Sequence, residues 1–282
     1  MKPAPFSYAR PSSLDRALEA LAGDEDAKVL GGGQSLVPML NFRLARPSAL
    51  IDVRLVPELH VLERRDGSLV IGAGVTQRTA ETSSLVADAC PLLPRALKLV
   101  GHLQTRSRGT IGGSLAHADP SAELPAVALA LDATFIAASL RGTREIPAAE
   151  FFFGPYMTSL EQDEILLEVR LPAPPSARAS FQEVSRRAGD FAMAGVATQL
   201  ELDGGRVTSA RLAATGIELA PVRLSAAEEV LVGSTLDDDV IDQASDRAAR
   251  AVDPRGDANA TPEHRRELVA ALVKRTIEEA AR

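Results

Sequence analysis

Two glycine-rich segments carry the clearest chemical signal of the chain. The first contains Val29, Leu30, Gly31, Gly32, Gly33, Gln34, Ser35 and Leu36. Three successive glycines leave backbone N–H groups uncovered by side chains and allow positive φ, so the amides can turn toward one anion. Ser35 adds a hydroxyl donor, and a helix that begins there adds the positive end of its dipole. The pattern indicates a cradle for a diphosphate, although a glycine triplet alone is equally compatible with a tight turn that binds nothing.

The second glycine segment has the same ingredients, with hydroxyl residues on both sides of a Gly-Gly pair. It contains Gly109, Thr110, Ile111, Gly112, Gly113 and Ser114. Downstream, Asp119 and Pro120 suit a helix N-cap and first helical position, and Glu123 falls in the first turn, where a carboxylate is favoured. That structural account and a ligand role are equally compatible with the spacing. Two segments of matching chemistry predict a long dinucleotide held at both ends.

Other chemical signatures are missing from the sequence. There is no GxxxxGK[ST] motif, and Gly72 and Gly74 are followed by Gln77 where a GxGxxG motif needs its third glycine. The four histidines lack the spacing of a zinc site. Cys90 is the single cysteine, which allows neither an internal disulfide nor an iron–sulfur cluster. We therefore predict that the chain has no metal site and no catalytic residues of its own.

Composition narrows the class of protein further. Apolar residues are 45% and charged residues 24% of the 282, as in an ordinary globular protein, and the length is sufficient for two domains. A net charge of −7 without a basic cluster argues against a nucleic-acid partner. No apolar run has the roughly 20 residues of a membrane span, and the first residues lack a signal-peptide pattern. We expect a cytoplasmic protein.

The glycine segments need a scaffold, and the periodicity predicts an α+β fold in two domains. Prolines at 172, 174 and 175 mark a stiff connector, which divides a domain over 1–175 from one over 176–282. The first domain has subdomains of about 1–55 and 56–175. Its expected helices cover 14–21, 92–100 and 123–131, and its strands 27–30, 50–53, 68–71, 134–138, 144–147 and 165–171. The second domain is expected to be a three-stranded antiparallel sheet (181–185, 196–202, 207–213) covered by helices over 226–232, 239–252 and 262–281.

With these segments in view, the chain resembles the FAD-binding medium subunits of the carbon monoxide dehydrogenase and xanthine dehydrogenase family of molybdenum hydroxylases. The resemblance rests on four stretches in the right order: GGGQSLVPMLNFRLARPSALIDV (31–53), GHLQTRSRGTIGGSLAHADPSAELPA (101–126), DEILLEVRLP (163–172) and EVSRRAGDFAMAGVA (183–197). It implies the PCMH-type, vanillyl-alcohol-oxidase-like FAD fold over 1–175. It also implies the C-terminal domain peculiar to these subunits.

The resemblance implies one non-covalent FAD between the two subdomains. Residues 29–36 would wrap the pyrophosphate, and residues 109–114, in a stretch that begins at Gly101, would bind from the other side. The family pattern adds four more cofactor-binding positions: Glu123, Leu166, Gln182 and Phe191. Some relatives have lysine where this chain has Gln182, so a charge contact is not carried over. Phe191 is equally compatible with a core aromatic, and His117 is the one histidine near enough for a covalent flavin link, which the resemblance argues against.

The implied function is electron transfer within a complex. A large partner subunit would carry the molybdenum cofactor, and a small one the [2Fe–2S] clusters; FAD would pass electrons to a quinone, oxygen or NAD. Two alternatives remain open from the residues. A self-sufficient flavin oxidoreductase of the same fold would need its own substrate pocket, for which the 4% aromatic content offers little. A non-catalytic nucleotide-binding module would be colourless.

Overall fold

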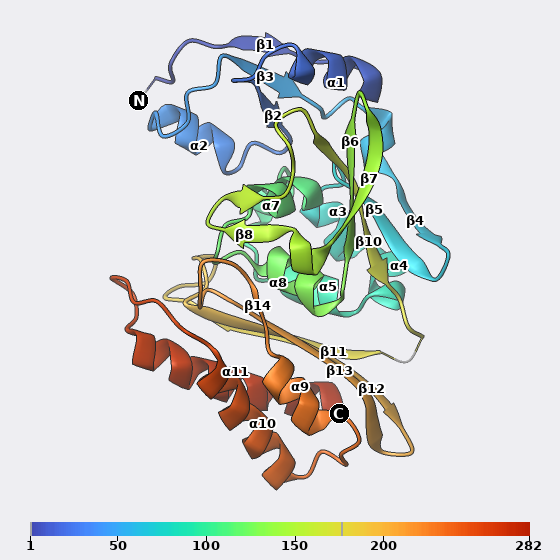
Figure 1. Cartoon of the computed structure of the whole chain (residues 1–282), viewed down its shortest axis with the longest axis vertical. Coiled ribbons are helices and arrows are strands. Elements are labelled where there is room, and N and C mark those ends of the chain that lie inside the picture. Colours follow the sequence, from blue (N-terminus) through green and yellow to red (C-terminus); the bar gives the residue numbers. More distant parts are fainter. Residues whose placement is uncertain (1, 176) are drawn as a thin grey trace.

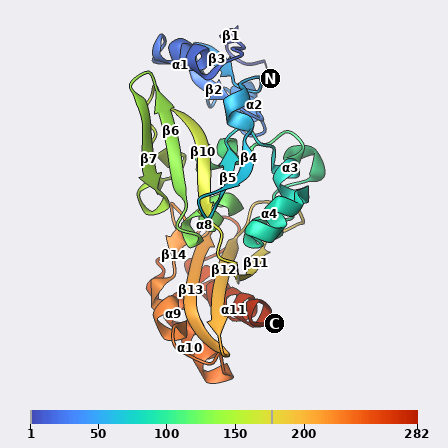
Figure 2. The ribbon, with the colours of Figure 1, turned by 90° about the vertical axis from the view of Figure 1, so that its right-hand side faces the viewer.

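The computed structural model describes residues 2–175 and 177–282 and confirms the α+β class. Three parts follow one another along the long axis of the molecule (Figures 1 and 2). Within the described ranges, no helix is long and apolar enough to cross a membrane. Nor do the side chains of these residues bring three or more His, Cys, Asp or Glu together as a metal site would require.

The first part is a small parallel sheet of strand order β1-β3-β2 with two helices. Its elements are β1 (Ser7–Ala9), α1 (Leu14–Ala22), β2 (Lys28–Leu30), α2 (Leu36–Asn41) and β3 (Ala49–Asp52). Ser13 caps α1 by accepting the N–H of Arg16, and the apolar stripe of Leu18 and Leu21 is buried. The predicted β–α–β unit is therefore present, and the first glycine segment is its β2–α2 turn.

The second part is built on a five-stranded antiparallel sheet of order β4-β5-β10-β6-β7. The strands are β4 (Leu62–Arg65), β5 (Ser68–Gly72), β6 (Thr134–Ser139), β7 (Gly142–Pro147) and β10 (Ile165–Pro172), with a hairpin of β8 (Phe152–Gly154) and β9 (Met157–Thr158). Short 3₁₀ turns, η1 (Pro57–His60) and η2 (Ala148–Glu150), connect elements at its edges. The stacked rings of Phe135 and Phe151, 4.0 Å apart, lie in its core.

Six short helices cover this sheet and carry the second glycine segment. They are α3 (Gln77–Thr82), α4 (Ser84–Ala89), α5 (Leu92–Leu97), α6 (Leu103–Arg106), α7 (Ile111–His117) and α8 (Glu123–Ala130). The prediction that Asp119 caps the last of these helices is wrong: α8 begins at Glu123 after Ala122. Asp119 instead accepts the N–H of Ser121 at 2.9 Å, because the chain turns once more before the helix starts.

The C-terminal part is a four-stranded antiparallel sheet, not the predicted three-stranded one. Its elements are β11 (Arg178–Val184), β12 (Ala194–Asp203), β13 (Arg206–Thr215), β14 (Val222–Arg223), α9 (Ser225–Leu231), α10 (Asp238–Ala251) and α11 (Pro262–Ala281). The strand β14 escaped prediction because it has two residues and directly follows Pro221, which leaves no alternation to detect.

This sheet has two buried faces. Phe181, Ala197 and Ala213 belong to the core of the second part, whereas Val196 and Leu212 belong to a separate core with the three C-terminal helices. The helices lie on one side of the sheet, and α5 and α8 lie on the other (Figure 1). Alternate side chains along each strand thus pack against the second part, which carries the second glycine segment, and hold the C-terminal part against it. The boundary at 175/176 stays a prediction, since Ser176 lies outside the described residues.

Candidate functional site

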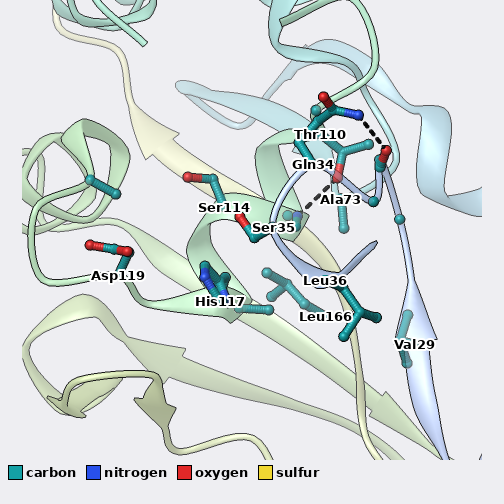
Figure 3. A pocket seen from close by; sticks show the side chains of 18 of the residues that line it. Val29, Gln34, Ser35, Leu36, Ala73, Thr110, Ser114, His117, Asp119 and Leu166 are labelled. Atoms are coloured by element: carbon teal, nitrogen blue, oxygen red, sulfur yellow. Dashed lines mark hydrogen bonds between the residues drawn. The ribbon is translucent and has the colours of Figure 1, made fainter. Parts of the chain in front are cut away.

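The two glycine segments line one cavity of about 820 Å³, which lies between the first and second parts of the molecule. Figure 3 shows Val29, Gln34 and Ser35 of the first segment around the same hollow as Thr110 and Ser114 of the second. The volume falls in the range of small-molecule and cofactor sites. The sequence alone could not show that the two segments lie near each other in space, because β3, β4 and β5 separate them along the chain.

Most of the predicted site residues line the cavity, and three do not. Those that line it are Val29, Gly31, Gly32, Gly33, Gln34, Ser35, Leu36, Gly101, Gly109, Thr110, Gly112, Gly113, Ser114, Glu123, Leu166 and Phe191. Leu30 and Ile111 are instead buried in hydrophobic cores. Gln182 points to the other face of β11, where its Nε2 donates to Glu279 of α11 at 2.7 Å.

The first segment offers unpaired donors. Among the hydrogen bonds of the described residues, none comes from the backbone N–H of Gly32, Gly33, Gln34 or Ser35. Gly33 has a positive φ of 75°, and Ser35 precedes α2 without using its side chain as a cap. Gln34 holds the turn by donating from Nε2 to the Gly32 carbonyl at 3.1 Å. A run of bare amides beside a cavity is suited to bind an anion.

The second segment differs, because all of its amides except that of Thr110 have partners among the described residues. The N–H groups of Ile111 and Gly112 donate to the carbonyls of Val75 (2.9 Å) and Ala73 (3.0 Å). Gly113 donates to Thr110 Oγ1 at 2.9 Å, which caps helix α7. The segment therefore contributes a wall and side chains, but not the matching amide cradle that its composition predicted.

Gln77 is a cavity residue that sequence reasoning missed. It is 4% exposed and lines the cavity, and its Oε1 has no hydrogen-bond partner among the described residues. Its backbone N–H donates to the Gly109 carbonyl at 2.8 Å, which fixes it beside the second segment. The signal in the sequence was its position three residues after Gly74, where the sequence alone indicates only a departure from GxGxxG. A buried amide without a partner costs free energy unless a ligand completes it.

A hairpin forms a further part of the wall that was not predicted. Tyr156 and Met157 line the cavity from the β8–β9 turn, and the Tyr156 hydroxyl donates to Asp119 at 3.3 Å. The Tyr156 ring lies 4.9 Å from that of His117. Burial lowers the pKa of His117, against the opposing charge of Asp119, so the imidazole is neutral at pH 7.

Two glutamates near the cavity have raised pKa values. Burial raises the pKa of Glu123, at the cavity wall, to about 7. Burial, and then the charge of Glu123, raise the pKa of Glu183 to about 8. Carboxyl groups in water titrate several units lower, so burial disfavours the ionised form of both side chains.

The fold and this cavity define a two-domain dinucleotide-binding protein whose cofactor diphosphate would meet bare amides. Comparison with known proteins identifies the family. Residues 4–174 match the FAD binding domain in molybdopterin dehydrogenase, and residues 179–280 match the CO dehydrogenase flavoprotein C-terminal domain. The chain belongs to this family of FAD-binding medium subunits, as the resemblance of its motifs predicted. The cavity fits FAD, because it combines sufficient volume with an unpaired amide cradle.

The relatives are subunits of oxidoreductases. The chain is 41% identical to the alpha subunit of the 6-hydroxypseudooxynicotine dehydrogenase complex of Paenarthrobacter nicotinovorans, over 99% of this chain and 96% of that one. Its structure is similar to that of quinoline 2-oxidoreductase from Pseudomonas putida 86, with a TM-score of 0.96, 40% identity, and coverage of 100% and 98%. It is also similar to carbon monoxide dehydrogenase from Hydrogenophaga pseudoflava, with a TM-score of 0.96, 36% identity, and coverage of 99% and 98%.

Proposed function

We propose that the chain is the electron-transfer subunit of a molybdenum hydroxylase complex. It holds one FAD non-covalently, receives electrons from [2Fe–2S] clusters on a small partner, and delivers them to a quinone, oxygen or NAD. The large partner carries the molybdenum cofactor and oxidises the substrate. The observation that carries the proposal is the shared cavity in which four unpaired amides of the first glycine segment face the wall made by the second.

Different residues of the chain hold different parts of the cofactor. The amides of residues 32–35 and the hydroxyl of Ser35 bind the diphosphate. The second segment has most of its amides occupied, so it offers the Ser114 hydroxyl, and the neighbouring Gln77 offers Oε1 as an acceptor for an N–H or O–H group of the cofactor. Leu166 and Phe191 enclose the cofactor from β10 and from the turn after β11. Gln182 serves the contact with α11 instead.

FAD supplies the redox chemistry when it is bound, since it exchanges electrons both singly and in pairs. The protein positions it and shields it from water. His117 is neutral, and burial raises the pKa of the thiol of Cys90 to about 12, so neither provides a charged partner or a reactive thiolate. We therefore assign no catalytic residue to this chain. A single buried cysteine also supports placing the iron–sulfur clusters on another subunit.

The relatives also suggest a substrate class for the whole complex. Those at 40–41% identity are named for 6-hydroxypseudooxynicotine, nicotine and quinoline, whereas the carbon monoxide enzymes are 32–36% identical. We propose that the complex, in the cytoplasm, hydroxylates a nitrogen-containing aromatic ring. The ring would bind to the large subunit.

The test uses the complex assembled with its two partner subunits. On mixing with the substrate, absorbance of the iron–sulfur clusters should bleach first and flavin absorbance next. A complex carrying a flavin-free form of this chain should still bleach its clusters but should not reduce the external acceptor. Acceptor reduction at an unchanged rate without flavin would overturn the proposal.

A further inference from the structure

The side chain of Glu183 points from the C-terminal sheet toward the start of α8. Along β11, Ala179 and Phe181 belong to the core shared with the second part of the molecule. Because side chains alternate along a strand, Glu183 lies on the same face. Across the sheet Glu183 is in register with Gly195, and Gly195 with Thr215. These three residues form a row on the face that meets the cavity-bearing part.

The end of this row is fixed against the turn before Glu123. The Thr215 hydroxyl lies 2.7 Å from the Ala122 carbonyl and 3.0 Å from the Pro120 carbonyl. In the middle, Gly195 leaves a gap: a Cβ there would lie 2.9 Å from Thr215 Cγ2 and 3.3 Å from Glu183 Cβ. The row therefore runs from Glu183 across a glycine to the turn before α8, close enough for the charge of Glu123, which faces the cavity, to act on Glu183.

Among the described residues, no Lys, Arg or His side chain forms an ion pair with either carboxyl group. Glu183 Oε2 is buried without a hydrogen-bond partner among the described residues, and Glu123 is 4% exposed. The charged groups that act on Glu123 are Asp119, which opposes its ionisation, and Arg106, which favours it. Arg106 is already paired with Glu81 at 2.9 Å, so its charge is largely compensated. Two ionised carboxylates are unfavourable in this setting.

We propose that Glu123 and Glu183 form an acid pair that retains a proton at neutral pH, and that FAD binding draws further protons onto this pair. The second half of the inference rests on the proposed function. A dinucleotide brings two phosphate charges into a cavity whose wall contains Glu123, so each proton on the pair lowers the repulsion. Linkage requires that binding and protonation then strengthen each other. Glu183 is a positioning residue in this scheme, because it acts on the cavity through Glu123.

The first experiment examines the pair without any flavin. Infrared spectra of the full chain should show, at pH 6, the carbonyl stretch of protonated carboxyl groups, which carboxylates lack, and this band should vanish between pH 6 and 9. Glu123→Gln and Glu183→Gln should each remove part of it, and the double variant should remove it. Glu150→Gln, at an exposed glutamate outside the cavity, should leave it unchanged. If the band is missing at pH 6, or if neither variant changes it, Glu123 and Glu183 do not form a protonated pair.

The second experiment measures the FAD dissociation constant of the full chain by flavin fluorescence between pH 6 and 9. As the pH rises, the FAD dissociation constant of the wild type should increase by up to about tenfold per pH unit for each proton taken up on binding. The double Gln variant should lose most of this slope. Equal slopes in the two proteins overturn the linkage. Absence of FAD binding at every pH contradicts the proposed function instead, and the infrared band still decides whether the pair exists.

Discussion

Gly32 lies directly against the main chain of Arg108 and Gly109, so that a Cβ on residue 32 would be 2.7 Å from both the Arg108 carbonyl carbon and Gly109 Cα. The two glycine segments therefore touch, and the glycine is required by the protein before any cofactor arrives. The sequence explained Gly32 by the approach of a ligand to bare backbone. The structure adds a second cause, because the first segment can seat on the second only where a side chain is missing.

Gly32→Ala should therefore impair folding as well as flavin binding. The added methyl group forces the two segments apart, which typically costs about 1–3 kcal/mol of unfolding free energy. Urea unfolding of the flavin-free chain measures this directly. An unchanged free energy of unfolding would show that the two segments can move apart to accommodate the methyl group without cost.

Gly33→Ala tests the amide cradle independently of the contact between the two glycine segments. Gly33 has a φ of 75°, which an alanine adopts at a cost of about 1 kcal/mol, and its amide is one of the unpaired donors. The matched control is Gly67→Ala in the β4–β5 turn, where φ is 77° and a Cβ meets open space. Both variants should lose stability, Gly33→Ala the more because its Cβ would lie 3.1 Å from Val37 Cγ2, but only Gly33→Ala should weaken FAD binding in a fluorescence titration. Equal affinities would remove residue 33 from the cradle.

The sequence predicted elements where local patterns are strong. The stripe of α1, the Thr261–Pro262 start of α11 and the alternation of β12 all appear within a few residues of their expected bounds. Helix α7 was missed, since a Gly-Gly pair reads as a turn. There, Thr110 caps the helix and neighbouring backbone satisfies its amides, and neither contact is visible in local sequence.

The candidate site was predictable where one segment contains both the chemistry and its geometry. The first glycine segment meets this condition. The contributions of Gln77, Tyr156 and Glu183 depend on contacts between distant parts of the chain, and their residue types are common on any surface. The similarity to a family extended the prediction to Leu166 and Phe191, but it also suggested Gln182, which lies on the opposite face of β11.

Gln77→Leu should weaken FAD binding without destabilising the protein. The unpartnered Gln77 Oε1 accepts, so its partner on FAD is a neutral N–H or O–H group, and such a hydrogen bond contributes about 0.5–1.5 kcal/mol, or roughly a 2- to 13-fold rise in the dissociation constant. Replacing a buried amide whose oxygen has no partner by an apolar group of similar shape is nearly neutral for folding or stabilising.

The matched control for Gln77 is Gln199→Leu. Gln199 is buried in β12, its Nε2 has no hydrogen-bond partner within the described part of the chain, and it does not line the cavity. Its substitution should leave both the urea midpoint and the flavin affinity near the wild-type values. A loss of stability in Gln77→Leu together with unchanged affinity would mean that Gln77 serves the fold and not the cofactor.

The stability of the flavin-free chain should fall as the pH rises from about 5 to 9. The folded-state pKa of Glu123 is raised by burial to about 7, and that of Glu183 to about 8, above the 4.5 of an ordinary glutamate. Between these limits the folded chain binds more protons than the unfolded chain. The contribution is therefore fully present below pH 4.5 and is lost as the pH rises through 7 and 8. Its size for the buried Glu123 is on the order of a few kcal/mol.

Urea unfolding at pH 5, 7 and 9 measures this slope, and the Glu123→Gln/Glu183→Gln variant should flatten it. The variant should also be the more stable protein at pH 9, because it no longer has to ionise two carboxyl groups inside the interface between the C-terminal sheet and α8. Glu150→Gln should keep the wild-type slope. If the double variant were as pH-dependent as the wild type, the titrating groups would lie elsewhere, and the acid pair would have no energetic role in the fold.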